Sequence, residues 1–98
     1  MVVVAEGELD LGSVELLRDA LRGPDGRGDT VVLDLRKLTF IDSSGLSLVV
    51  GEHQRARAES FDFAVAVGGA REVQRLFDLA GLQETVRLVE HPDSVFTS

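Results

Sequence analysis

The sequence contains no cysteine, tryptophan or tyrosine, and its five aromatic residues are all phenylalanine. Without cysteine, the chain can form neither a disulfide framework nor a thiolate metal site. With so few aromatic side chains, the core of a globular fold must be built from Val, Leu, Ile and Ala. Hydrophobic residues make up 44% of the 98 residues. This fraction favours a single folded domain over residues 1–98 rather than disorder.

Long apolar runs and a basic leader are also absent. The longest apolar stretches are far too short to cross a bilayer. The chain begins Met-Val-Val-Val-Ala-Glu, which has neither the basic start nor the apolar length of a signal peptide. We therefore expect a cytoplasmic protein.

Basic residues are outnumbered, with 10 Lys and Arg against 17 Asp and Glu, so the formal net charge is −7. Phosphate backbones and anionic membranes repel such a surface, and we expect no direct contact with nucleic acid or membrane. The two histidines, His53 and His91, are far apart and form no metal-spaced cluster. We expect no metal site and no cofactor.

Two kinds of apolar segment alternate along the chain. Short apolar runs predict strands over 2–6, 30–35, 61–67 and 85–89, with a separate extended piece at 39–41. The run at 2–6 is β-branched, and the run at 61–67 alternates before it becomes apolar. Helical spacing predicts helices that begin at Ser13, Asp42, Ala70 and Pro92, the last carrying Val95 and Phe96. A loop with three glycines is expected near 24–29. This order predicts an α/β fold with a mostly parallel four-stranded sheet and alternating helices.

The first predicted strand has nothing before it to cover its outer edge. An exposed strand edge offers unpaired backbone groups to another chain. We expect this edge either to lie exposed or to pair with another chain, which would include a homodimer.

Two adjacent serines, Ser43 and Ser44, follow a buried strand and open a helix. Free backbone N–H groups and the positive end of the helix dipole lie there, and such a terminus accepts an anion. The simpler interpretation is that Asp42 is an N-cap and the serines only fill the first turn. Gly45 removes bulk beside the serines, so another protein could approach closely.

Other residues near this segment have two interpretations each. Asp10 and Asp42 either orient the serine hydroxyl and repel a phosphate, or serve as a turn residue and a helix cap. Asp34 lies inside an apolar strand or near the same strand ends. Leu46 lies on the predicted apolar stripe of the helix, whereas Leu48 falls off it. We therefore expect Leu48 to be exposed and favour it as a partner contact.

The segment Asp42-Ser43-Ser44-Gly45-Leu46 resembles the diagnostic motif of STAS domains, specifically of the bacterial anti-sigma factor antagonists. Gly7-Glu8-Leu9-Asp10 looks like the family's Gly-Glu-Leu-Asp turn, and Leu79-Ala-Gly-Leu82 looks like its Leu-Thr-Gly-Leu ending. The resemblance covers nearly the whole chain in the right order, and implies a STAS-like fold. It differs in two respects. Family members usually carry an additional N-terminal strand that pairs with the strand preceding Gly-Glu-Leu-Asp, and they often have a proline early in the first helix, where this chain has Glu15.

The resemblance implies an anti-sigma factor antagonist that is not an enzyme, with Ser44 as the phosphorylation site. It implies that the unphosphorylated chain binds an anti-sigma factor and frees the sigma factor. The anti-sigma factor is itself the serine kinase, acting with ATP, and a phosphatase reverses the modification. The residues expected to flank the switch or contact the partner are Asp10, Asp42, Ser43, Gly45, Leu46 and Leu48.

Two other functions remain open. The chain could serve as a STAS module in a different assembly, such as a stress-signalling or lipid-transport complex. A serine between a strand and a helix is also typical of hydrolases, but the first glycine of Gly-x-Ser-x-Gly is missing here. A hydrolase needs a base near the serine, and His53 is more than two helical turns beyond Ser44. The sequence does not place His91 relative to Ser44.

Overall fold

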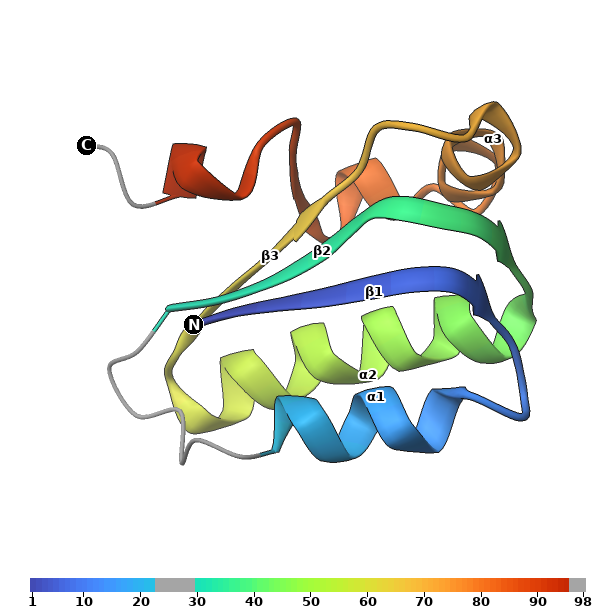
Figure 1. Ribbon diagram of the computed structural model, residues 1–98. Helices are drawn as coiled ribbons and strands as arrows, with labels where there is room; N and C mark the ends of the chain where they lie inside the picture. The colour runs from blue at the N-terminus through green and yellow to red at the C-terminus, as the bar shows by residue number, and fades with distance from the viewer. Residues whose placement is uncertain (23–29, 96–98) are drawn as a thin grey trace.

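The computed structural model describes residues 1–22 and 30–95 (Figure 1). The strands are β1 (Val2–Leu9), β2 (Thr30–Ile41), β3 (Asp62–Ala66) and β4 (Arg87–Val89). The helices are α1 (Val14–Leu21), α2 (Ser43–Glu59) and α3 (Arg71–Leu79), with two 3₁₀ segments, η1 (Leu82–Glu84) and η2 (Pro92–Val95). The loop expected near 24–29 and the residue Phe96 lie outside the described residues.

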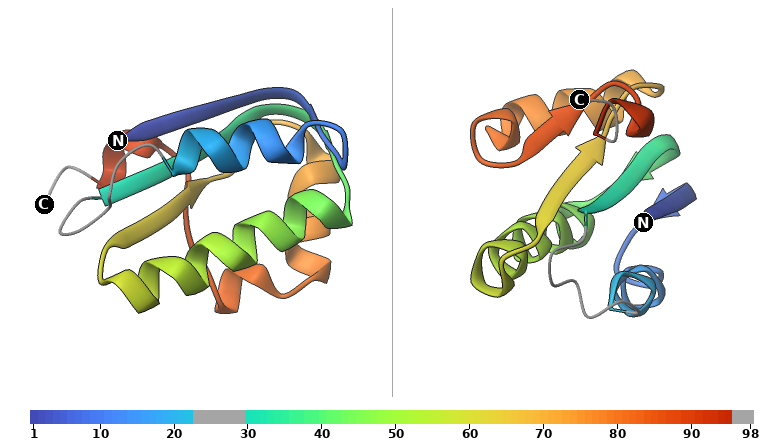
Figure 2. Two further views of the ribbon diagram at one scale, coloured as in Figure 1. Left: turned by 90° about the horizontal axis from the view of Figure 1, so that it is seen from below. Right: turned by 90° about the vertical axis from the view of Figure 1, so that its left-hand side faces the viewer.

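The four strands form one parallel sheet in the order β1-β2-β3-β4. Helices α1 and α2 lie against one face of the sheet, and α3 and the C-terminal segment lie on the other side (Figures 1 and 2). The predicted α/β fold with a parallel four-stranded sheet is therefore confirmed. None of the helices in the described residues is long and apolar enough to span a membrane.

The core is aliphatic, as the composition predicts. Side chains from β1, β2 and β3 and from all three helices join one buried apolar cluster. Phe77 on α3 is the largest fully buried side chain. Along β1 the side chains alternate, so that Val3 and Ala5 face the core while Val2 and Val4 are exposed. This period of two fixes which face of the edge strand meets solvent.

The structure differs from the sequence-based expectation at two elements. Strand β2 runs without interruption from Thr30 to Ile41, although a break was expected between residues 35 and 39. Its pairing with β1 has two register shifts, and these allow the strand to continue through the polar residues of that segment. The last predicted helix is a single 3₁₀ turn, η2, rather than an α-helix. Both errors concern short segments, where the periodicity spans too few residues to separate element types.

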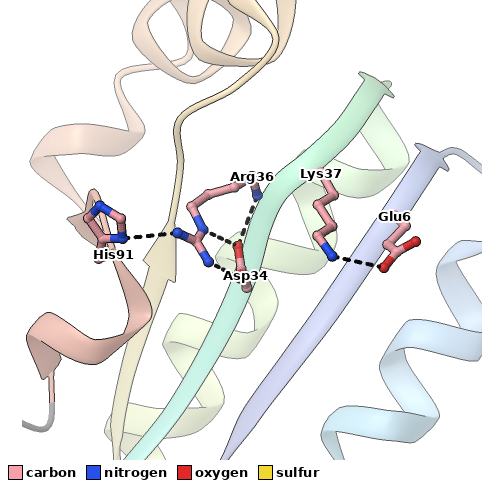
Figure 3. Close-up of polar contacts among 5 residues, drawn as sticks. All are labelled: Glu6, Asp34, Arg36, Lys37 and His91. Carbon is pink, nitrogen blue, oxygen red and sulfur yellow. Dashed lines mark hydrogen bonds and ion pairs between the residues drawn. The ribbon is translucent and has the colours of Figure 1, made fainter.

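Asp34, whose position the sequence leaves open, is buried in β2 and pairs with Arg36 (Figure 3). Arg36 Nε donates to Asp34 Oδ1 and Arg36 Nη2 to Asp34 Oδ2, both at 3.0 Å. Arg36 Nη1 lies 3.0 Å from Nδ1 of His91, at the start of the C-terminal segment. The pair therefore ties that segment to the sheet, and Asp34 takes no part in the serine site.

Because of this ion pair, we expect the free energy of unfolding to fall in acid. Hydrogen bonds from the Arg36 side chain hold the pKa of the Asp34 carboxyl below its usual range. Because the folded pKa is the lower one, the pair stabilises the fold above the unfolded pKa of about 3.9 and loses this effect as pH falls through the folded value. We expect the free energy of unfolding to fall below about pH 4 in urea titrations, and to fall less in Asp34→Asn. An unchanged acid slope in Asp34→Asn would contradict the assignment.

Candidate functional site

The first turn of α2 is built by an aspartate cap. Asp42 adopts an extended backbone conformation, and its Oδ1 accepts hydrogen bonds from the backbone N–H of Ser44 at 2.8 Å and of Gly45 at 3.3 Å. The capping role of Asp42 is therefore confirmed. A carboxylate at this position also interacts favourably with the positive end of the helix dipole.

The two serines of the pair differ in exposure. Ser43 is exposed and Ser44 is half-buried. Neither hydroxyl forms a hydrogen bond with another of the described residues. The pair lies where β2 turns into α2, at the carboxyl end of the parallel strands (Figure 1). Binding residues on parallel α/β sheets concentrate at this end.

Asp10 lies beside Asp42 because β1 and β2 end together. Leu9 pairs with Ile41, and the backbone N–H of Asp42 donates to the Leu9 carbonyl at 3.1 Å. Asp10 Oδ1 is occupied by the turn, where it accepts from the N–H groups of Gly12 and Ser13, both at 3.1 Å. Asp10 is thus a turn-forming residue at the ends of β1 and β2.

Ser13, expected to cap α1, makes no side-chain cap bond to that helix. Its hydroxyl instead donates to the carbonyl of Glu8 at 3.0 Å. The Asp10 carbonyl accepts from Val14 N–H at 2.9 Å, so Asp10 organises the start of α1 with both its backbone and its side chain. The competing hydrogen bonds of a tight turn explain why a simple capping rule fails here.

Gly45 serves packing rather than partner access, which corrects the sequence-based interpretation. The residue is buried, and a Cβ atom there would lie 2.5 Å from Ile41 Cγ1 and 3.0 Å from Leu9 Cγ. Only glycine lets the first turn of α2 sit directly on the ends of β1 and β2. The position of the serine pair depends on this close approach.

A pair of glycine substitutions on α2 tests this role. We expect Gly45→Ala to lower the free energy of unfolding by about 1–3 kcal/mol, since Leu9 and Ile41 must shift. Gly51, exposed on the same helix, has no atom within 4 Å of an added Cβ. Gly51→Ala should therefore stabilise the protein by about 0.5–1 kcal/mol. Urea unfolding measures both, and equal effects of the two substitutions would contradict the packing role.

The expectation for Leu48 is wrong, whereas Leu46 packs against the core as expected but is only partly buried. Leu48 is only 2% exposed and belongs to the core. The buried stripe of α2 also contains the charged residue Glu52. The buried face of α2 predicted from apolar residues alone is therefore rotated about the helix axis relative to the face that the structure buries. Leu48 is not available as a partner contact, and Leu46 is only partly so.

Two exposed apolar side chains at the ends of β2 and α3 were not predicted from the sequence. Phe40, two residues before the Asp42 cap, is 47% exposed, and Leu79 on α3 is 73% exposed. Phe40 and Leu79 line an open hollow of about 360 Å³ with Ile41, Leu76, Glu72 and Arg75. The signal available was the alternation of β2, which turns Phe40 away from the core when Ile41 faces it. The hollow lies between the end of β2 and α3.

The serine hydrolase alternative lacks a base. His53 lies on α2 nine residues after Ser44, about 13 Å along the helix axis. His91 contacts Arg36, near the middle of β2 and about 20 Å of strand from Asp42. Neither imidazole is within hydrogen-bond reach of the Ser44 hydroxyl. Over residues 1–22 and 30–95, no three His, Asp or Glu side chains are grouped so as to hold a metal ion.

Comparison with known proteins gives consistent matches. The sequence model of the STAS domain matches residues 1–95. The anti-sigma F factor antagonist of Paenibacillus polymyxa is 27% identical over 99 residues, which cover 99% of this chain and 84% of that protein. The structure of the anti-sigma factor antagonist SpoIIAA in its unphosphorylated form superimposes with a TM-score of 0.73. It is 24% identical over 96% of this chain and 83% of that one, and supports the fold.

Proposed function

The chain belongs to the STAS domain family, and from this membership we propose that it is an anti-sigma factor antagonist acting in the cytoplasm. In this proposal it is a binding module rather than an enzyme, formed as one domain by residues 1–98. The unphosphorylated form binds an anti-sigma factor that is also a serine kinase. Phosphorylation of Ser44 releases that partner, and a phosphatase restores binding.

One observation carries the proposal: the Ser44 hydroxyl is unbonded among the described residues and sits on the first turn of a well-anchored helix. A kinase needs a hydroxyl that it can reach, whereas a merely structural serine in a first turn commonly bonds a backbone group. The resemblance to antagonists, whose motif has its phosphorylated serine second in the pair, selects Ser44 over Ser43.

The charges around Ser44 support a switch that acts on binding. The Asp42 carboxylate already accepts the N–H of Ser44, so a phosphate on this residue gains little from the helix terminus. Asp10 lies beside Asp42 and adds a second carboxylate. The phosphorylated surface is then strongly negative, whereas the unphosphorylated one presents a neutral hydroxyl at this position.

A capture experiment from the native host tests the proposal. Immobilised wild type and Ser44→Ala should both retain an anti-sigma factor with kinase activity, whereas Ser44→Asp should not. Ser43→Asp places the same charge one residue away and is the matched control, which should bind better than Ser44→Asp. Capture of a stress-signalling or lipid-transport complex instead would assign the domain to another STAS assembly. Equal capture by wild type and Ser44→Asp would contradict the switch.

A further inference from the structure

The free edge of β1 has backbone groups without partners. The carbonyls of Met1, Gly7 and Leu9 accept hydrogen bonds from residues on or just after β2. Since backbone groups alternate in direction along a strand, those of Val2, Val4 and Glu6 point away from the sheet. Ser13 occupies the carbonyl of Glu8. The backbone from Val2 to Glu6 is left open, because no other described residue bonds its outward groups.

An apolar groove of about 240 Å³ runs beside this edge, between β1 and α1. Its apolar lining comes from Val3, Ala5, Leu16, Leu17 and Ala20, among others. Leu16 is 76% exposed, although its neighbour Leu17 is in the core. A strand added to β1 would place alternate side chains over Leu16 and Ala20, and would cover apolar surface that now faces solvent.

The charge of the groove specifies its occupant. Glu6 and Glu8 are among its lining residues, and no lysine or arginine is. Their side chains lie on the exposed face of β1, opposite Val3 and Ala5, so they would meet the alternate side chains of an added strand. Lys37 on β2 pairs with Glu6 at 3.5 Å, while the Glu8 carboxylate forms no ion pair within the described residues. A second copy of this chain would bring the same carboxylates and a net charge of −7 to the edge, which opposes self-association.

We propose that the β1 edge and the groove beside it bind an extended segment of a partner protein as an added strand. The segment alternates apolar residues, which face Leu16 and Ala20, with basic residues, which face Glu6 and Glu8. The site is separate from Ser44. A Ser44→Asp variant should therefore bind such a segment as the wild type does, so failure of this proposal and failure of the serine switch are distinguishable.

The probe is the capped synthetic peptide Lys-Ile-Lys-Ile-Thr-Val-Thr, and its matched control is Glu-Ile-Glu-Ile-Thr-Val-Thr. Calorimetry with the full chain should show roughly tenfold weaker binding of the acidic peptide. Glu8→Lys should weaken the basic peptide and strengthen the acidic one. Leu16→Ser should weaken both, whereas Leu11→Ser, which removes an equally exposed leucine outside the groove, should change neither.

Amide hydrogen exchange locates the binding. The N–H groups of Val4 and Glu6 should exchange quickly in the free protein and become protected when the basic peptide is added. Absence of binding, equal binding of the two peptides, or protection confined to α2 or α3 would overturn the proposal. Protection of Val4 and Glu6 that rises with protein concentration alone would also overturn it, in favour of pairing between two copies.

Discussion

Phosphorylation of Ser44 is expected to weaken binding of the anti-sigma factor about a hundredfold, which corresponds to about 3 kcal/mol. The modification adds a charge of about −1.5 to −2 beside the Asp42 carboxylate. In the free domain, water and salt screen this repulsion, and the helix terminus offsets roughly 0.3–1 kcal/mol of it. In the complex the phosphate loses its water. At roughly 6 Å and an effective dielectric constant near 20, each pair of like unit charges then costs about 3 kcal/mol.

Calorimetric titration of the captured partner with both forms of the chain measures this effect. The phosphorylated chain should still unfold cooperatively, with a midpoint close to that of the unmodified chain. This combination separates a change in binding from a change in folding. Equal affinities, or loss of cooperative unfolding on phosphorylation, would contradict the account.

Replacing Arg55 by alanine is expected to lower the free energy of unfolding by about 3–5 kcal/mol. Glu52 is buried on the core face of α2, and Arg55 donates to its Oε2 from Nη2 at 2.9 Å and from Nε at 3.1 Å. Arg55 also reaches the carbonyl of Leu21 at 3.1 Å and lies 4.9 Å from the centre of the Phe61 ring. Its removal leaves a buried carboxylate without its cation and separates α2 from the end of α1.

Denaturant unfolding of four variants tests this role of Arg55. Arg57→Ala removes an exposed arginine from the same helix and should change stability by less than about 0.5 kcal/mol. The double variant Glu52→Met/Arg55→Met should be more stable than Arg55→Ala, because it removes both charges together. If the double variant is the least stable of the four, the cost of Arg55→Ala does not come from leaving the Glu52 carboxylate unpaired, and this explanation is contradicted.

The fold could be predicted from the sequence because its signals agree over long segments. The β-branched run at the start of β2, the apolar run of β3 and the helical spacing of α3 each point to one element type. Gly81 has a φ of 68°, in the left-handed region predicted after α3. Alternation of strands and helices then leaves few arrangements other than a parallel sheet.

The serine site was predictable in part. The aspartate cap and the helix start follow from local rules that involve adjacent residues, and the structure bears them out. The roles of Gly45 and Leu48 depend on contacts with β1 and on the rotation of α2, which local patterns do not contain. The buried Glu52 misplaced the stripe, since a carboxylate counts as polar in the pattern. Its burial depends on Arg55, which pairs with it one turn later on the same helix and also bonds the Leu21 carbonyl.

The most direct test of the serine switch is phosphosite mapping of the chain purified from its native host, divided into partner-bound and free fractions. The account predicts phosphate on Ser44 in the free fraction and an unmodified Ser44 in the fraction that carries the anti-sigma factor. Phosphate on Ser44 in the partner-bound fraction, or on Ser43 in place of Ser44, would contradict it.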